Sequence, residues 1–256
     1  MAQAAERAVL AADGAGPDDA EEHSPQPAER IAAIVPVAGL STRMGAFKPL
    51  LTIDGQPLIR LTVTSALLGG ASSVCVVLGR EAERVRAVLV DLPGVFFVEN
   101  PRFANSDMLT SVQRGLRALL DAGHKSGRGP KGGASFMSRK DSEEPIPLCP
   151  TEPPPDAIFI LPGDMPAIKP ETFRLLAERA TSSAAAILYP QFDGRRGHPL
   201  FLRREAFAAV LEFCGDGGVK AAVADFAAET VASTDVGILL DIDTPEAYAR
   251  MPGSHR

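Results

Sequence analysis

The sequence predicts an α/β fold: a three-layer sandwich in which helices cover both faces of a mostly parallel β-sheet. Short runs rich in valine and isoleucine recur along the chain, and segments of helical period stand between them. This alternation is typical of βαβ crossovers, which build a parallel sheet. Such a sheet binds ligands beyond the carboxyl ends of its strands, so the residues that follow each strand are the candidates for function.

The predicted strands are mostly continuous apolar runs, because a strand covered on both faces needs no alternation of polar and apolar residues. They are residues 31–37, 51–53, 73–78, 95–98, 157–161, 184–189, 200–202 and 238–240. The predicted helices have apolar residues at helical spacing, or begin at proline and end before glycine. They are residues 57–68, 81–90, 108–120, 170–180, 205–211, 219–226 and a terminal helix from 246.

Composition predicts one domain over residues 31–252, because 45% hydrophobic content in 256 residues is enough for one large core. The net charge of −6 is unevenly distributed. Residues 1–30 hold seven acidic and two basic residues, which predicts a disordered acidic tail. The remainder holds 25 acidic and 24 basic residues, and this balance argues against general nucleic-acid binding.

A flexible insertion is predicted at residues 123–155, within the domain. Of these 33 residues 16 are glycine, proline or serine, and the segment ends in three prolines. Such a composition is typical of a loop that has no packed core of its own.

Cysteine usage and hydropathy predict a cytoplasmic protein. The three cysteines are widely spaced and form no C-x-x-C pair, so neither a disulfide framework nor a zinc site is indicated, and Cys75 is expected to pack in the core. No apolar run approaches the 18 or so residues of a membrane span. Residues 1–25 have neither a basic leader nor an apolar segment of signal-peptide length.

The segment after the first strand has the composition of an anion-binding loop. Gly39 and Gly45 allow the backbone to approach a ligand closely, and Ser41 offers a hydroxyl group. Arg43 and Lys48 add a guanidinium and an ammonium group that can bind phosphate oxygens. The spacing matches neither a Walker A loop nor G-x-G-x-x-G. The alternative is an ordinary strand-to-helix connection with solvated cations.

Two aspartates follow predicted strands and are candidate metal ligands. Asp164 comes directly after the strand at 157–161, and Asp243 stands at a similar position 79 residues later. Two carboxylates from different strand ends suit Mg²⁺, which takes phosphates and waters as its other ligands. The alternative is that Asp164 caps the following turn and Asp243 caps the last helix.

His198 is the one histidine embedded in a segment with ordered-looking composition. It offers a possible catalytic base. A nucleophile that is itself a phosphate is already ionised at neutral pH, however, and needs no base. We therefore expect His198 to shape a loop or to donate a hydrogen bond to an anionic substrate.

Five motifs follow one another along the chain. They are Ala38-Gly-Leu-Ser-Thr-Arg-Met-Gly45 with Lys48, Asn100-Pro101 followed by Leu109-Thr-Ser-Val112, Gly163-Asp-Met-Pro166, Gly197-His-Pro199, and Asp241-Ile-Asp-Thr-Pro245. In this order they resemble the molybdenum cofactor cytidylyltransferases, which have the Rossmann-like nucleotide-diphospho-sugar transferase fold. The resemblance extends over about residues 31–250, apart from the insertion.

The resemblance implies a role for each motif. The implied nucleotide-binding residues are Ala38, Gly39, Leu40, Ser41, Gly45, Lys48, Asn100 and Ser111. Arg43, Lys48 and Asp164 would be catalytic, and Asp164 and Asp243 would hold Mg²⁺. Gly197, His198 and Pro199 would lie beside the pterin substrate.

The function predicted in this way is transfer of CMP from CTP to the terminal phosphate of molybdopterin, with release of pyrophosphate. The expected partners are CTP or another nucleoside triphosphate, a molybdopterin-type phosphate acceptor, and a molybdoenzyme or its maturation chaperone; neither nucleic acid nor a membrane is expected. One alternative is a related transferase that uses GTP, or a sugar or alcohol phosphate acceptor. Another is a non-catalytic escort that binds the cofactor during molybdoenzyme assembly.

Overall fold

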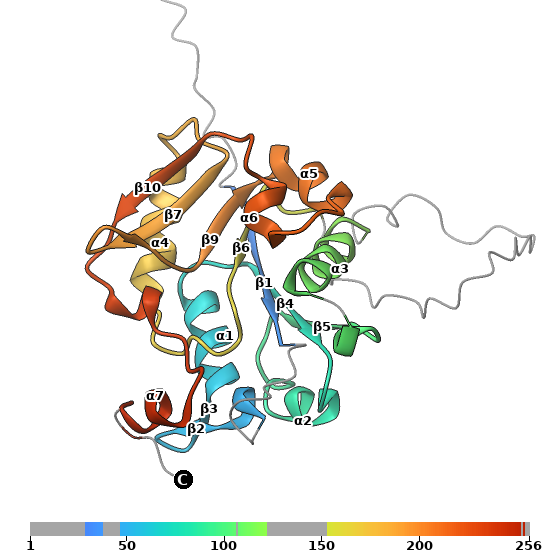
Figure 1. Ribbon diagram of the computed structural model, residues 1–256, viewed down its shortest axis with the longest axis vertical. Helices are drawn as coiled ribbons and strands as arrows, with labels where there is room; N and C mark the ends of the chain where they lie inside the picture. Colours follow the sequence, from blue (N-terminus) through green and yellow to red (C-terminus); the bar gives the residue numbers. More distant parts are fainter. Residues whose placement is uncertain (1–28, 38–46, 106, 122–152, 252, 254–256) are drawn as a thin grey trace, which may run out of the picture.

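The computed structural model describes residues 29–37, 47–105, 107–121, 153–251 and 253 (Figure 1). The predicted acidic tail, apart from its last two residues, lies outside the described residues, and so does the predicted insertion, apart from residues 153–155. In the described part of the chain no helix is both long enough and apolar enough to cross a membrane.

One half of the main sheet is parallel. β1 (Ile31–Pro36) lies between β4 (Ser73–Leu78) and β6 (Ala157–Ile160), and β5 (Val95–Glu99) forms the edge beyond β4. All four strands run in the same direction, so their carboxyl ends meet at one edge of the sheet. The burial of nearly every residue in β1, β4 and β6 explains why these strands are continuous apolar runs.

The other half of the sheet is mixed. β9 (Leu200–Arg203) is antiparallel to both of its neighbours, β6 and β7 (Ile187–Phe192), so β7 runs in the same direction as β6. β10 (Ala228–Ala232) is parallel to β7 at the other edge, and the short strand β8 (Arg195–Arg196) turns back on β7. The carboxyl end of β7 therefore lies at the same edge of the sheet as that of β6.

Helices cover both faces of this sheet, and the predicted three-layer sandwich is confirmed. α1 (Leu58–Leu68), α2 (Ala82–Ala87) and α4 (Pro170–Ala180) bury apolar side chains in a cluster on one face. α3 (Met108–Asp121), α5 (Phe207–Glu212) and α6 (Gly218–Ala222) form a second cluster on the other face, where they are grouped together in Figure 1. Cys75 is buried in this second cluster, as predicted.

A small unit lies beside the carboxyl edge of the sheet. The hairpin of β2 (Thr52–Ile53) and β3 (Gln56–Pro57) packs near α7 (Pro245–Ala249) through an apolar cluster of its own. Four 3₁₀ helices complete the described elements: η1 (Lys48–Leu50), η2 (Phe103–Asn105), η4 (Arg204–Ala206) and η5 (Val236–Leu239).

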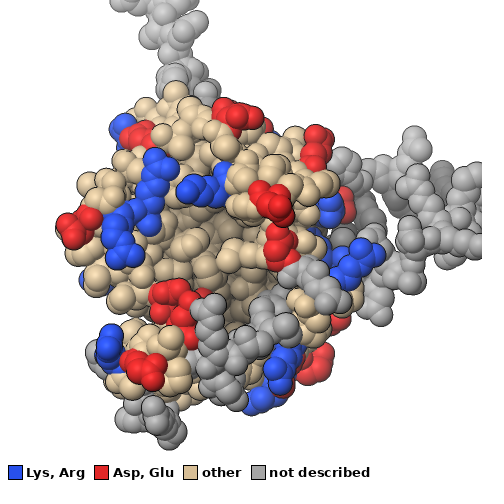
Figure 2. Space-filling model, in the orientation of Figure 1, with Lys and Arg blue, Asp and Glu red and all other residues tan. Residues whose placement is uncertain are grey.

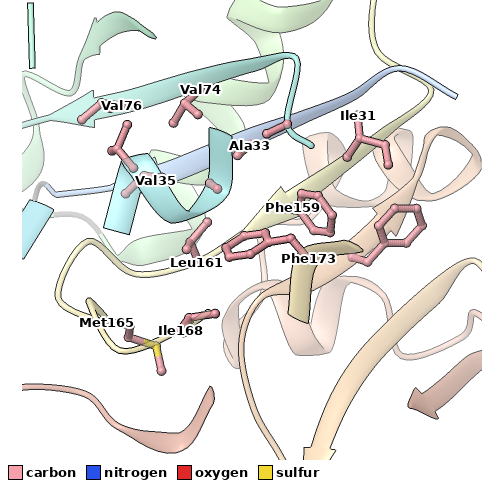
Figure 3. Close-up of a cluster of buried hydrophobic side chains, with 14 of the residues drawn as sticks. Ile31, Ala33, Val35, Val74, Val76, Phe159, Leu161, Met165, Ile168 and Phe173 are labelled. Atoms are coloured by element: carbon pink, nitrogen blue, oxygen red, sulfur yellow. The ribbon is translucent and has the colours of Figure 1, made fainter. Parts of the chain in front are cut away.

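Three phenylalanines join β6 to its neighbours in the first cluster. The Phe159 ring packs edge-on against Phe173 of α4, with 5.1 Å between centroids, and against Phe201 of β9 at 5.5 Å. Figure 3 shows Phe159 and Phe173 beside the aliphatic side chains of β1 and β4. This packing fixes the strand that leads into the candidate aspartate Asp164.

In the last third of the chain one predicted strand is wrong and the last strand was not predicted. Residues 238 and 239 belong to the 3₁₀ helix η5 rather than to a strand, and Leu240 follows its end. The Asp235 side chain accepts a hydrogen bond from the Gly237 backbone N–H (2.9 Å) and starts this helical turn. The last strand is instead β10, whose sequence AETVA carries polar residues and buries only Val231. An edge strand of this composition has little apolar signal.

Phe159→Ala should lower the free energy of unfolding by about 3–5 kcal/mol, because it opens a cavity beneath two aromatic neighbours. Phe103→Ala is the matched control, since this ring is partly exposed in η2 and belongs to neither of the two main clusters. Urea denaturation of both variants measures the difference. Equal losses in the two proteins would show that the first cluster does not centre on Phe159.

Candidate functional site

Lys48 stands at the centre of the candidate site, at the start of η1. Its side chain is only 11% exposed, and its ammonium group forms an ion pair with Asp243 and lies 3.7 Å from a carboxylate oxygen of Asp164. The three residues come from segments far apart in the sequence. Two of the predicted metal ligands therefore face one cation at the carboxyl edge of the sheet.

The backbone around Gly163 sets the position of Asp164. The Gly163 N–H donates to the carbonyl of Pro36 at the end of β1 (3.3 Å). A Cβ atom on Gly163 would lie 2.3 Å from a methyl group of Val37, so a larger residue would push the two segments apart. The adjacent strand ends thus approach closely, and Asp164 emerges beside the segment that leads to Lys48.

Asp243 reaches the same place from the segment before α7. The Ile242 N–H donates to the carbonyl of Asp164 (3.2 Å), which ties this segment to the end of β6. The alternative that Asp243 caps the last helix is wrong, because Thr244 is the N-cap and its hydroxyl accepts from the Ala247 N–H (3.1 Å). The Asp243 carboxylate is thus directed to Lys48 rather than to the helix.

The surroundings of Asp164 disfavour the charged form of its carboxyl group. Burial raises its pKa above the ordinary aspartate value, and the negative charges of Asp243 and Asp241 raise it further, whereas Lys48 opposes the shift. Its side chain is 22% exposed. A carboxylate held under these conditions favours the approach of an additional cation.

The residues 197–199 lie at the same edge of the sheet. The Gly197 N–H donates to Pro190 and the His198 N–H to Ile238, each over 2.9 Å. A Cβ atom on Gly197 would lie 2.4 Å from the carbonyl oxygen of Ile238, so glycine permits the close contact between this segment and η5. Pro199 is buried directly before β9.

His198 is held neutral by its surroundings. Burial lowers its pKa, while a hydrogen bond with the backbone of Ile160 and the charge of Asp241 act in the opposite direction. Its Nδ1 atom is buried and has no hydrogen-bond partner in the described part of the chain. The contact with Ile160 places the imidazole at the end of β6, and both His198 and Asp164 experience the field of Asp241.

Asn100 and Ser111 form a separate polar pair at the ends of β4 and β5. Both side chains are buried, and the Asn100 amide donates to the Ser111 hydroxyl (3.1 Å). The Asn100 N–H donates to Leu78 at the end of β4, and its side-chain oxygen accepts from the Arg102 N–H. In the strand order this pair lies on the opposite side of β1 from Asp164.

The predicted anion-binding loop follows β1 along the chain. Ala38, Gly39, Leu40, Ser41, Arg43 and Gly45 lie outside the described residues. Val37, the last described residue before the loop, donates its N–H to Val77 of β4 (2.9 Å), and Phe47 resumes the described chain directly before η1. The loop therefore starts at the carboxyl end of β1, which stands between β6 and β4 in the sheet.

Asp164 and Asp243 fit a divalent cation that is completed by a ligand's phosphates. The described residues contain no group of three or more histidine, cysteine or acidic side chains that would hold a metal ion on its own. Two carboxylates that already converge on one ammonium group are nevertheless the donor set that Mg²⁺ uses with substrate phosphates.

Sequence reasoning missed two features of this region. It assigned Lys48 to phosphates alone and did not foresee its contacts with the two carboxylates, which depend on tertiary packing. It also gave no role to Arg196, whose guanidinium lies over the ring of Tyr189 at 4.9 Å. Two consecutive arginines next to the Gly197-His198-Pro199 motif were the available signal.

The chain belongs to the MobA-like NTP transferase family, because the model of the MobA-like NTP transferase domain matches residues 33–231. It is 22% identical over 218 residues to a molybdenum cofactor cytidylyltransferase of Escherichia coli (strain K12), a match covering 85% of this chain and 93% of the relative. It is 29% identical over 97 residues to a 2-aminoethylphosphonate cytidylyltransferase of Lancefieldella rimae, covering 36% of this chain and 39% of that relative. A match of 28% over 181 residues with the bifunctional protein GlmU of Anaeromyxobacter sp. (strain K) covers 68% of this chain and 30% of the relative. The chain therefore spans less than half the length of the last two relatives.

Solved structures confirm the predicted α/β fold. Rv0371c from Mycobacterium tuberculosis H37Rv superposes with a TM-score of 0.64 at 24% identity, over 88% of this chain and 97% of that one. A nucleotidyl transferase from Methanothermobacter thermautotroptrophicus gives 0.63 at 24% identity, over 86% and 95%. Rv0371C in complex with manganese gives 0.59 at 23% identity, over 88% and 98%.

The burial of His198 should make stability depend on pH. Because its folded-state pKa is lowered, its contribution to stability is fully present above the ordinary histidine pKa of about 6.5 and is lost as the pH falls through the lowered value. The free energy of unfolding should therefore fall more steeply for the wild type than for His198→Gln between about pH 7 and pH 5. Denaturant titrations over this range measure both slopes, and parallel curves would contradict a buried neutral imidazole.

Proposed function

We propose that this protein transfers a cytidylyl group from CTP to the terminal phosphate of molybdopterin and releases pyrophosphate. The observation that carries the proposal is the convergence of Asp164 and Asp243 on Lys48 at the carboxyl edge of the sheet. The family match supports nucleotidyl transfer. The similarity to a molybdenum cofactor cytidylyltransferase over most of both chains supports this nucleotide and this acceptor.

The chemistry requires charge neutralisation more than proton transfer. An oxygen of the acceptor phosphate attacks the α-phosphorus of CTP in line, and the bond from that phosphorus to the pyrophosphate breaks. The acceptor phosphate is already ionised, so the neutral His198 is not needed as a base. The task of the site is to hold the two substrates and to offset negative charge on the transferring and leaving groups.

In this proposal Asp164 and Asp243 would hold Mg²⁺, which supplies positive charge next to the phosphoryl oxygens when it is bound. Lys48 lies between the carboxylates and would exchange its contact with Asp243 for a triphosphate oxygen when nucleotide binds. We further propose that Arg43 and the loop N–H groups receive the pyrophosphate end. Gly197, His198 and Pro199 would line the acceptor side, next to Asp164.

We also propose that residues 31–252 form one catalytic domain, interrupted in the sequence by the insertion at 123–155. β1 and β10, near the two ends of this range, belong to one sheet, which supports a single unit. A molybdoenzyme or its maturation chaperone would receive the product. The cytoplasm is the compartment in which we propose that this reaction takes place.

A second candidate is cytidylyl transfer to a different acceptor. The 29% identity to a 2-aminoethylphosphonate cytidylyltransferase favours it, although that match covers only 36% of this chain. The two candidates share the nucleotide site and differ on the acceptor side, near His198. They are therefore separated by the acceptor that supports turnover.

Pyrophosphate release should be fastest with CTP and molybdopterin and should require a divalent cation. The assay compares CTP, GTP, ATP and UTP, each with molybdopterin or 2-aminoethylphosphonate, with and without Mg²⁺ or Mn²⁺. Turnover with 2-aminoethylphosphonate alone would select the second candidate. Tight nucleotide binding without turnover under every condition would instead indicate a non-catalytic escort.

Asp164→Asn should lower pyrophosphate release by at least about 100-fold, because it removes one of two carboxylates from the proposed metal site. The free energy of unfolding should not fall, since burial penalises the charge of Asp164 in the folded protein. Asp241→Asn is the matched control. Asp241 is exposed, its charge acts on Asp164, and it has no proposed role as a metal ligand. Near-normal turnover of Asp164→Asn would refute the metal assignment.

A further inference from the structure

The hairpin of β7 and β8 presents two arginines that are not neutralised within the described part of the chain. Arg195 and Arg196 are both exposed, and neither forms an ion pair with a described carboxylate, whereas Arg60, Arg86 and Arg179 each do. The Arg196 guanidinium packs over the ring of Tyr189 instead, at 4.9 Å. A guanidinium that stacks on an aromatic ring keeps its N–H groups available to a ligand.

The sheet topology places this hairpin beside the candidate site. β7 runs in the same direction as β6, so the turn into β8 lies at the carboxyl edge from which Asp164 emerges. β8 leads directly into Gly197 and His198, and His198 contacts Ile160 at the end of β6. Figure 2 shows lysine and arginine side chains over the region of β7 and β10, on one side of a hollow in this face of the molecule.

The hairpin holds its cations in a defined position. Asp193 and Gly194 adopt left-handed backbone conformations (φ 47° and 73°), as a tight two-residue turn requires. Arg196 pairs with Gln191 and Arg195 with Phe192 across the hairpin. Tyr189 is partly buried against the second apolar cluster, so its ring is a fixed platform for the Arg196 guanidinium.

The charges on the two sides of the site differ in sign. Asp164 and Asp243 lie beside Lys48, and the charge of Asp241 acts on Asp164. These carboxylates repel an anionic acceptor unless a metal or another cation intervenes. Lys48 is already engaged by two of these carboxylates. An anionic acceptor therefore needs a source of positive charge on its own side, and Arg196 of the hairpin is the candidate for it.

We propose that Arg196, held on Tyr189, forms an anion subsite that binds the phosphate end of the acceptor and selects phosphomonoesters over neutral alcohols. The inference rests on the proposed nucleotidyl transfer and adds a specificity element to that site. A guanidinium binds two oxygens of a phosphomonoester side by side. The third oxygen forms the new bond to the α-phosphorus, and pyrophosphate leaves with the electron pair of the broken bond.

The first test observes the subsite without turnover. The chain contains only two tyrosines, Tyr189 and Tyr248, so NMR of ¹³C-labelled tyrosine rings gives one reporter in the subsite and one in a different apolar cluster. Inorganic phosphate, as the probe, should shift the Tyr189 resonances of the full-length protein and leave those of Tyr248 unchanged. The shift should persist in Arg117→Gln, which changes an exposed arginine on α3, and disappear in Arg196→Gln.

The second test measures steady-state kinetics with CTP and molybdopterin. Arg196→Gln should raise the KM for molybdopterin by about tenfold or more, since it removes a charge-assisted contact, and should change the KM for CTP by less than about twofold. Arg196→Lys should recover only part of the loss, because an ammonium keeps the charge but lacks the planar fork. Arg117→Gln should match the wild type in both constants.

The outcomes separate this inference from the proposed function. An unchanged KM for molybdopterin in Arg196→Gln, or an equal Tyr189 shift in that variant, would overturn the subsite even if the wild type turns over. A different result would be that no nucleotide supports turnover with molybdopterin, while phosphate still shifts the Tyr189 resonances in the wild type and not in Arg196→Gln. This result would contradict the proposed acceptor and support the anion subsite.

Discussion

The contact of Lys48 with Asp164 and Asp243 is the interaction on which the candidate site depends. Lys48 and Asp243 lie 195 residues apart, and their ion pair joins the segment after β1 to the segment before α7. Gly163 makes this possible, because only a residue without a side chain lets the end of β6 approach Val37 closely. A single ammonium group thus holds together parts of the chain that each supply one component of the site.

The same contact combines effects that act in opposite directions on the charge of Asp164. Burial and neighbouring carboxylates raise the pKa of Asp164, so its charge is costly in the absence of a cation, and Lys48 offsets only part of this cost. A metal bound with a nucleotide would complete the neutralisation. The stack of Arg196 on Tyr189 supplies positive charge that is held by a hairpin and not by a pair of acidic side chains. The site thus has a side with carboxylates that attract a cation and a side with a guanidinium that attracts an anion.

Much of the fold is predictable from the sequence, because buried strands of a parallel sheet consist of continuous apolar residues. β4 and α4 were predicted with the bounds that the structure shows, and β1 to within one residue. β10 was missed because it is a polar edge strand, and η5 was misassigned because the Asp235 side chain starts a helical turn that hydrophobicity does not indicate. The strand-end rule placed Asp164 at the carboxyl edge of the sheet. Asp243 reaches the same place, but from the segment after η5 and not from the end of a strand as predicted. The rule could not predict the partners of Lys48 or the ring beneath Arg196, since both depend on tertiary contacts between segments that follow no sequence pattern.

The most direct test of the account is a crystal structure of the protein with Mn²⁺ and a non-hydrolysable CTP analogue, in which anomalous scattering locates the metal. We expect Mn²⁺ between the carboxylates of Asp164 and Asp243, bound also to the triphosphate, and we expect Lys48 to have moved from Asp243 to a phosphate oxygen. A triphosphate bound elsewhere, or Lys48 still paired with both aspartates while nucleotide and metal are present, would contradict the claim that these three residues form a nucleotidyl-transfer centre.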